Sequence, residues 1–198
     1  MLVNPLEGIP FLLAKTGSFD LDVRNQIARR AATAVTVILL VSALIGARVL
    51  ELFGIGLPAF QLGGGIILFL IALQMTLSGV GNDEPQAASA ATHHSPGDIA
   101  IVPLAIPLLA GPGAVSGAIL YGTKTQSLMN LAVLCSIVVV VGVAVYVSLR
   151  LAQQLRGLLG NLGINIATRL MGLLIAAIAA QLTVEGLLSL MASLKPAA

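Results

Sequence analysis

Long runs without a charged residue constrain this chain more than any other feature of its sequence. No Asp, Glu, Lys or Arg occurs in Leu52–Asn82, Ile99–Thr123 or Thr125–Leu149. Two shorter runs cover Ala31–Ala47 and Leu170–Val184. A transmembrane helix needs about 20 mostly apolar residues to cross a hydrocarbon core of about 30 Å. Because charged side chains that flank a short run can extend to the lipid headgroups, all five runs predict transmembrane helices.

The composition supports a membrane location and excludes other classes of protein. Of the 198 residues, 58% are hydrophobic and 9% are charged, whereas a typical soluble domain has about 25% charged residues. This excludes a soluble enzyme, a nucleic-acid binder and a disordered tail. A single cysteine, Cys135, excludes an internal disulfide and a cysteine metal cluster. The sequence contains no catalytic constellation, so we expect no enzymatic activity, metal or cofactor.

The start of the chain is apolar but too short to span a membrane. Met1–Ala14 contains Pro5, Gly8 and Pro10, which interrupt a regular helix. It also lacks the basic start and the small-residue cleavage site of a signal peptide. We predict that it forms a half-helix or re-entrant segment and completes a set of six membrane segments. The following stretch, Lys15–Arg30, is predicted to be a polar link.

The whole chain, residues 1–198, is predicted to form a single membrane domain with two halves. The first half covers residues 1–80 and the second covers residues 99–192. Residues 81–98 are rich in Ala, Ser and Pro, and this composition predicts a flexible link between the halves.

The basic residues favour one orientation. Seven of them fall on one predicted side of the membrane: Lys15, Arg24, Arg29, Arg30, Arg150, Arg156 and Arg169. The other three fall on the opposite side: Arg48, Lys124 and Lys195. Short loops that carry more Lys and Arg tend to lie in the cytoplasm. We therefore expect a multi-pass protein of the inner (plasma) membrane with both termini outside the cytoplasm.

The two halves contain the same pattern of residues. A constant offset of 107 residues pairs Gly65 with Gly172, Ala72 with Ala179, Gln74 with Gln181, and Thr76 with Thr183. An offset of 102 residues pairs Pro5 with Pro107, Leu6 with Leu108, Gly8 with Ala110, and Pro10 with Pro112. Because each half holds an odd number of membrane segments, the second half enters the membrane from the opposite side. We predict an all-α membrane protein of two inverted three-helix repeats, with segments one and four broken by Pro and Gly, an arrangement typical of secondary transporters.

The two broken segments are the candidate substrate-binding site. Proline removes a backbone donor, and an unsatisfied backbone group in lipid costs several kcal/mol, so broken backbone at membrane depth must line a cavity or be buried in protein. We expect its amides and carbonyls to bind the charged ends of a small substrate or a coupling ion, with a simple helix kink as the alternative. The candidate residues are Asn4, Pro5, Gly8, Pro10, Pro107, Gly111, Pro112 and Gly113.

Polar residues on otherwise apolar segments are further candidates. Gln74 and Gln181 are expected to face the bundle interior and line the site, with hydrogen bonding between helices as the alternative. Glu7 could carry a proton or bind a cation, unless it is a carboxylate at the membrane surface. Arg169 and Glu185 are expected near opposite ends of the last helix, with their side chains extended towards the headgroups.

Several blocks of the sequence resemble the MarC family of integral membrane proteins. They include NPLEGIP from Asn4, PLAIPLLAGPGA from Pro103 and TRLMGLLIAAIAAQLTVEGL from Thr168. The resemblance implies a six-helix inner-membrane protein, and some members of the family are described as transporters of small neutral amino acids. Family members usually carry an apolar run before the first block, so we expect either that the start of this chain is misassigned or truncated or that its first broken helix has lost its outer half. The chain also departs from the family at Glu7, where a small or polar uncharged residue is expected, and at Gln74, where an acid is common.

We therefore expect an inner-membrane transporter that carries glycine- or alanine-sized neutral amino acids by alternating access. The expected partners are the lipid bilayer, the amino acid, and a coupling cation or proton, with no nucleic acid, while a homo-oligomer is left open. The alternative is a non-transporting membrane scaffold or stress-response protein of the same family. That alternative predicts a closed, apolar interior between segments one and four.

Overall fold

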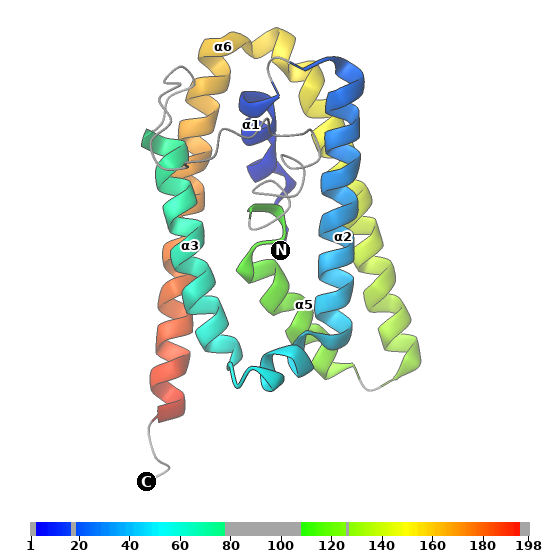
Figure 1. Cartoon of the computed structure of the whole chain (residues 1–198), viewed down its shortest axis with the longest axis vertical. Coiled ribbons are helices and arrows are strands. Elements are labelled where there is room, and N and C mark those ends of the chain that lie inside the picture. The colour runs from blue at the N-terminus through cyan, green and yellow to red at the C-terminus, as the bar shows by residue number, and fades with distance from the viewer. Residues whose placement is uncertain (1–2, 17–18, 78–107, 126, 195–198) are drawn as a thin grey trace.

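The computed structural model describes residues 3–16, 19–77, 108–125 and 127–194, which form helices and short connections without any strand (Figure 1). The helices are α1 (Pro5–Lys15), α2 (Leu21–Leu52), α3 (Leu57–Leu77), α5 (Pro112–Lys124) and α6 (Leu128–Leu194). The flexible link predicted for residues 81–98 lies outside the described residues.

Helix α6 consists of two long parts that meet at a turn. Gly160 adopts φ 59° and ψ −178°, a conformation that is nearly restricted to glycine. The chain therefore reverses there, and the second half of α6 runs back beside α3 (Figure 1).

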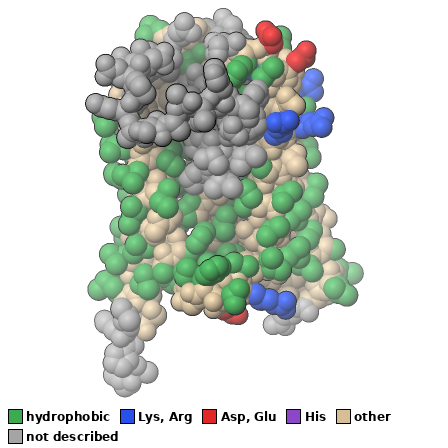
Figure 2. All heavy atoms as spheres, in the orientation of Figure 1, with side chains coloured by type: hydrophobic (Ala, Val, Ile, Leu, Met, Phe, Trp, Pro, Cys, Tyr) green, Lys and Arg blue, Asp and Glu red, His purple; other side chains and the backbone are tan. Residues whose placement is uncertain are grey.

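Within the described residues, four helical stretches are long and apolar enough to cross a membrane. They are Leu21–Leu52, Leu57–Leu77, Leu128–Ala152 and Leu162–Ser193. No more than 22% of the most apolar window of each is buried inside the molecule, so most of their apolar side chains face outwards, where lipid would surround them. On the face seen in Figure 2, hydrophobic side chains cover the middle band and charged side chains lie towards the two ends.

Helices α1 and α5 are half-helices. They contain 11 and 13 residues, which span only about 16 and 20 Å at 1.5 Å per residue. Both begin near the middle of the molecule and run towards opposite ends (Figure 1). Their beginnings lie close together, because a Cβ atom added at Gly8 would lie 3.0 Å from Cδ2 of Leu109, just before α5.

The charge-free runs locate the spanning helices but not all of their ends. Four of the five runs coincide with spanning helices, as predicted. The run Ile99–Thr123 is not one continuous helix, because Gly111 is extended and α5 begins only at Pro112. The predicted polar link Lys15–Arg30 is also wrong in part, because α2 already begins at Leu21. Asp22 in the first turn of α2 favours this early start through its interaction with the helix dipole.

Small residues allow α3 and the second half of α6 to pack closely in an antiparallel pair. A Cβ atom at Gly65 would lie 3.0 Å from the backbone nitrogen of Thr183, and one at Gly172 would lie 3.0 Å from that of Thr76. Both threonine hydroxyls donate to their own helix, Thr76 to Ala72 O at 2.9 Å and Thr183 to the equivalent carbonyl at 2.8 Å. The contact is therefore reciprocal, with the same residue types exchanged between the two helices.

Candidate functional site

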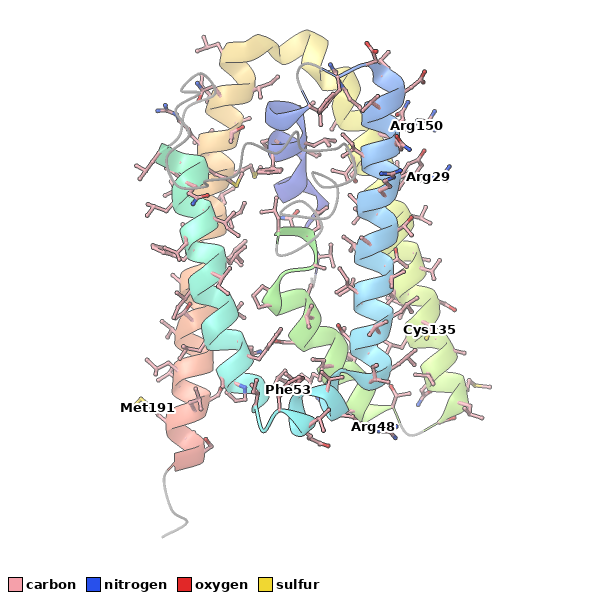
Figure 3. The ribbon with its side chains drawn as sticks, viewed as in Figure 1. Arg29, Arg48, Phe53, Cys135, Arg150 and Met191 are labelled. Atoms are coloured by element: carbon pink, nitrogen blue, oxygen red, sulfur yellow. The ribbon has the colours of Figure 1, made fainter. Side chains whose placement is uncertain are left out.

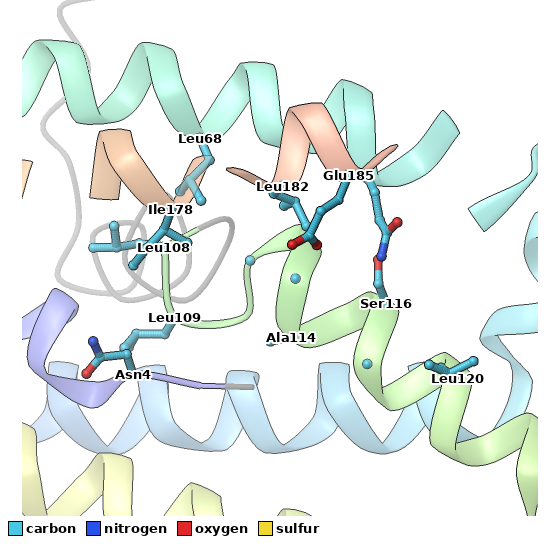
Figure 4. Close-up of a pocket in the computed structure, with 14 residues that line it drawn as sticks. Asn4, Leu68, Leu108, Leu109, Ala114, Ser116, Leu120, Ile178, Leu182 and Glu185 are labelled. Atoms are coloured by element: carbon cyan, nitrogen blue, oxygen red, sulfur yellow. The ribbon is translucent and has the colours of Figure 1, made fainter. Parts of the chain in front are cut away.

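A cavity of about 540 Å³ lies where the start of α5 meets α3 and the second half of α6 (Figure 4). Its lining residues are Asn4, Gln61, Leu68, Leu108, Leu109, Gly111, Gly113, Ala114, Ser116, Gly117, Leu120, Ile178, Leu182 and Glu185. The cavity is mostly apolar, with a small set of polar groups near α5, a composition typical of small-molecule sites.

The first turn of α5 presents backbone donors to the cavity. Gly111 is the N-cap residue and has no side chain that could accept a hydrogen bond. Val115 N donates to Gly111 O at 3.0 Å, and Pro112 has no N–H group. The N–H groups of Gly113 and Ala114 therefore have no acceptor within the helix. Because a helix N-terminus also carries a partial positive charge, this turn favours an anionic ligand.

Ser116 adds an unsatisfied hydroxyl to the same cavity. The residue is 2% exposed, and its Oγ has no hydrogen-bond partner among the described residues. By contrast, Ser136 Oγ donates to Ala132 O at 2.8 Å, and Thr168 Oγ1 donates to Ile164 O at 2.8 Å. A buried hydroxyl without a partner costs about 1–3 kcal/mol. Its position in the cavity wall therefore indicates a place where a ligand or water supplies the missing partner.

Glu185 brings a carboxylate to the cavity. Its side chain extends from the second half of α6 towards the beginning of α5 (Figure 4). Gln181 Nε2 donates to Glu185 Oε1 at 2.8 Å, which holds the carboxylate in place and leaves its other oxygen for a ligand. Glu185 was expected near the end of its helix, and α6 continues beyond it to Leu194.

The structure brings together only some of the predicted site residues. Asn4, Gly111 and Gly113 line the cavity. Pro112 is buried, and a Cβ atom at Gly64 would overlap its ring. Pro112 therefore fixes the approach of α5 to α3 and does not line the cavity.

Other predicted site residues lie elsewhere. Gly8 and Pro10 are buried in α1 and do not line the cavity. The side chain of Pro5, the side chain of Glu7 and the whole of Pro107 lie outside the described part of the chain.

The predicted orientation of the two glutamines is wrong. Gln74 and Gln181 are both exposed, and neither lines the cavity. Helix α3 is apolar on all sides, so its sequence carries no periodic pattern to indicate which face is buried. Gln181 still contributes indirectly, through its hydrogen bond to Glu185.

Three residues line the cavity but were not predicted from the sequence as part of the site: Ser116, Gln61 and Glu185. A signal for the position of Ser116 was present, because it follows the predicted site residue Gly113 by three residues and therefore lies on the same face of α5. A carboxylate can bind a cationic group, whereas the amides at a helix N-terminus and a hydroxyl group can donate to an anionic one. In the part of the chain that the structure describes, no group of three or more His, Cys, Asp and Glu residues could hold a metal ion.

Comparison with known proteins places this architecture among integral membrane proteins. A family model described as MarC family integral membrane protein matches residues 1–191. The UPF0056 membrane protein YhcE of Escherichia coli (strain K12) is 34% identical over 186 residues, covering 94% of this chain and 86% of that protein. A UPF0056 membrane protein of Methanocaldococcus jannaschii is 34% identical over 191 residues, covering 94% of this chain and 90% of the relative. A UPF0056 membrane protein of Pyrococcus abyssi is 31% identical over 189 residues, covering 94% of this chain and 89% of that protein. No solved structure matches the chain.

Proposed function

The chain belongs to the MarC family of integral membrane proteins, and we propose that it transports glycine- or alanine-sized neutral amino acids across the inner membrane. The names of the relatives give no substrate, so the proposal rests on the cavity. The observation that carries it is the buried, unpartnered hydroxyl of Ser116 beside the uncapped first turn of α5.

The start of α5 suits the carboxylate of an amino acid. The N–H groups of Gly113 and Ala114 and the hydroxyl of Ser116 all belong to the first turns of one helix. A bound carboxylate would take the place of the missing N-cap side chain and accept hydrogen bonds from these donors. Hydrogen bonds to a charged group contribute about 1.5–3 kcal/mol each, more than those between neutral groups.

Glu185 suits the ammonium group of the same molecule. It is the acidic residue of the cavity wall, and ionisable residues in membrane segments commonly mark substrate or ion pathways. A cationic group at Glu185 and an anionic group at α5 would fit a zwitterion, whereas a neutral solute would leave the carboxylate without a counter-charge. The cation at Glu185 could also be the proposed coupling proton or cation before the substrate arrives.

The arrangement of the helices supports transport by alternating access between two inverted repeats. The half-helices α1 and α5 begin near the middle of the molecule and point in opposite directions (Figure 1). The repeat also pairs Gly65 with Gly172 and Thr76 with Thr183, the residues that make the reciprocal contact between α3 and α6. Inverted repeats with broken helices at the binding site are the common basis of alternating access.

The alternative, a non-transporting scaffold, fits the cavity less well. It predicts a closed, apolar interior at the start of α5. The cavity instead contains Ser116, Glu185 and the amides of α5, and a scaffold gives no reason to keep a buried hydroxyl unpaired. We therefore favour transport.

Uptake of labelled glycine, alanine and serine into proteoliposomes tests the proposal. We expect Ser116→Ala to raise the half-saturating concentration about 10- to 100-fold, because it removes one hydrogen bond to a charged group. Ser136→Ala is the matched control, since its hydroxyl is exposed and bonded to its own helix, and it should behave as the wild type. Background flux of all three substrates with the wild-type protein would contradict the proposal.

Replacement of Glu185 tests the ammonium site separately. Glu185→Gln keeps the shape of the side chain and removes its charge, so we expect flux at low substrate concentration to fall at least about tenfold. Glu51→Gln, an exposed position at the end of α2, is the control and should leave flux unchanged. If Glu185→Gln transports as well as the control, Glu185 does not bind the ammonium group or the coupling cation.

A further inference from the structure

A second hollow, far from the start of α5, lies on the outer surface between α2 and the first half of α6. It has a volume of about 370 Å³. Its lining residues are Arg29, Ala32, Thr33, Thr36, Val37, Val139, Gly142, Val143 and Tyr146. We refer to these residues as the α2–α6 groove. Nothing in the proposed transport cycle uses this groove.

The walls of the groove are apolar even where its residues carry hydroxyl groups. Thr33 Oγ1 donates to Arg29 O at 2.8 Å, and Thr36 Oγ1 donates to Ala32 O at 2.8 Å. These hydroxyls are therefore satisfied within α2, and the threonine methyl groups remain for contact. Gly142 allows α2 and the first half of α6 to approach closely along the floor of the groove, because a Cβ atom there would overlap the side chain of Thr36.

The groove has the length of a lipid chain segment in one leaflet. Arg29 and Val37 lie eight residues apart on α2, which corresponds to about 12 Å along the helix. One leaflet of the hydrocarbon core is about 15 Å thick. An acyl chain in the groove would therefore place its headgroup close to Arg29.

One end of the groove is positively charged. Arg29 is exposed and lines the groove, and Arg150 is exposed one turn beyond Tyr146 on α6. Figure 3 shows both arginines towards the same end of the molecule, with Arg48 at the other end. Neither Arg29 nor Arg150 forms an ion pair with another described residue. The nearest acid on α2, Asp22, lies seven residues before Arg29, about 10 Å further from the hydrocarbon core.

We propose that the α2–α6 groove binds an anionic phospholipid, with its phosphate at Arg29 and Arg150 and one acyl chain along the apolar walls. A zwitterionic headgroup such as that of phosphatidylcholine also has a phosphate, but its ammonium group cancels the net negative charge that two guanidinium groups favour. A free phosphate ion, in turn, would gain nothing from the apolar part of the groove. The proposal does not depend on the substrate of the transporter.

Native mass spectrometry of the detergent-purified full-length protein tests this proposal. We expect it to retain phosphatidylglycerol in preference to phosphatidylcholine of the same acyl composition. Each arginine near an anionic headgroup contributes about fivefold to lipid binding, so Arg29→Gln with Arg150→Gln should lower retention about 25-fold. Arg48→Gln with Lys124→Gln removes the same charge at the other end and should retain phosphatidylglycerol as the wild type does.

A second pair of variants tests the apolar part of the groove without changing charge. Val143→Phe fills the groove and should lower retention of phosphatidylglycerol. Val140→Phe, on the same helix but outside the groove, should not. Equal retention of the two lipids, equal loss in the charge controls, or unchanged retention in Val143→Phe would each overturn the proposal. Displacement of the lipid by inorganic phosphate would also overturn it, since it would assign the site to phosphate alone.

Discussion

At the scale of single residues, glycine determines how closely the helices can approach. Gly122 on α5 faces the backbone of α2, where an added Cβ atom would lie 2.9 Å from the carbonyl carbon of Ala43 and 3.2 Å from its Cα. Backbone atoms cannot move aside as a flexible side chain can. The contact between α2 and α5 therefore requires glycine at this position.

We predict that Gly122→Ala lowers the stability of the protein by about 1–3 kcal/mol, the usual cost of adding a methyl group to a closely packed interface. The control is Gly63→Ala on α3, where an added Cβ atom has nothing within 4 Å. Alanine stabilises a helix by about 1 kcal/mol relative to glycine, so Gly63→Ala should not destabilise the protein. Thermal unfolding in detergent measures both. A midpoint for Gly122→Ala equal to that of the control would contradict the packing seen here.

Single residues also show what the sequence could not decide. The breaks at Gly111 and Pro112 could be predicted, because proline and glycine have local effects on the backbone. The orientation of Gln74 could not be predicted, because it depends on which face of an apolar helix contacts the neighbouring helices. The helix face on which Ser116 lies could be predicted from its spacing, but its lack of a hydrogen-bond partner is recognisable only once the surrounding contacts are known.

At the scale of elements, the reciprocal contact between α3 and α6 determines the antiparallel pair. A Cβ atom added at Gly65, which faces Thr183, would lie 3.1 Å from the carbonyl oxygen of Ala179. A Cβ atom added at Gly172, which faces Thr76, would lie 3.0 Å from the carbonyl oxygen of Ala72. The two sites are therefore nearly equal in geometry. The repeat proposed for the chain accounts for this equality.

We predict that Gly65→Ala and Gly172→Ala destabilise the protein by similar amounts, about 1–3 kcal/mol each. The reason is that each added methyl group meets backbone atoms of the opposite helix at the same distance. Thermal unfolding of the two variants, with Gly63→Ala again as control, provides the comparison. A large effect at one glycine and none at the other would contradict the reciprocal contact and weaken the proposal of two repeats.

The ends of the elements were harder to predict than their existence. The charge-free run Ala31–Ala47 identified the middle of α2, yet the helix extends from Leu21 to Leu52. Arginine is a good helix former, and its long side chain can reach the headgroups from within a helix. Charge therefore limits the part of a helix that lies in lipid, but it does not end the helix.

At the scale of the whole molecule, the helices separate the basic residues into two groups. Arg29 and Arg150 lie towards one end and Arg48 towards the other (Figure 3). The three arginines labelled in Figure 3 therefore lie on the sides predicted for them, with Arg29 and Arg150 in the group of seven and Arg48 in the group of three. Since basic residues are enriched on the cytoplasmic side, the end with Arg29 and Arg150 is predicted to face the cytoplasm.

Cysteine labelling in intact cells tests this orientation. Cys135 is replaced by alanine, and a single cysteine is introduced at Asp22 or Ser127, which are exposed residues beside the starts of α2 and α6 at opposite ends of the molecule. We predict that a membrane-impermeant maleimide labels Ser127→Cys in intact cells and labels Asp22→Cys only after the cells are opened. The reverse pattern would place the termini inside and overturn the orientation. Labelling of both in intact cells would mean that the chain inserts in both directions, and the excess of basic residues at one end would then be too small to determine its topology.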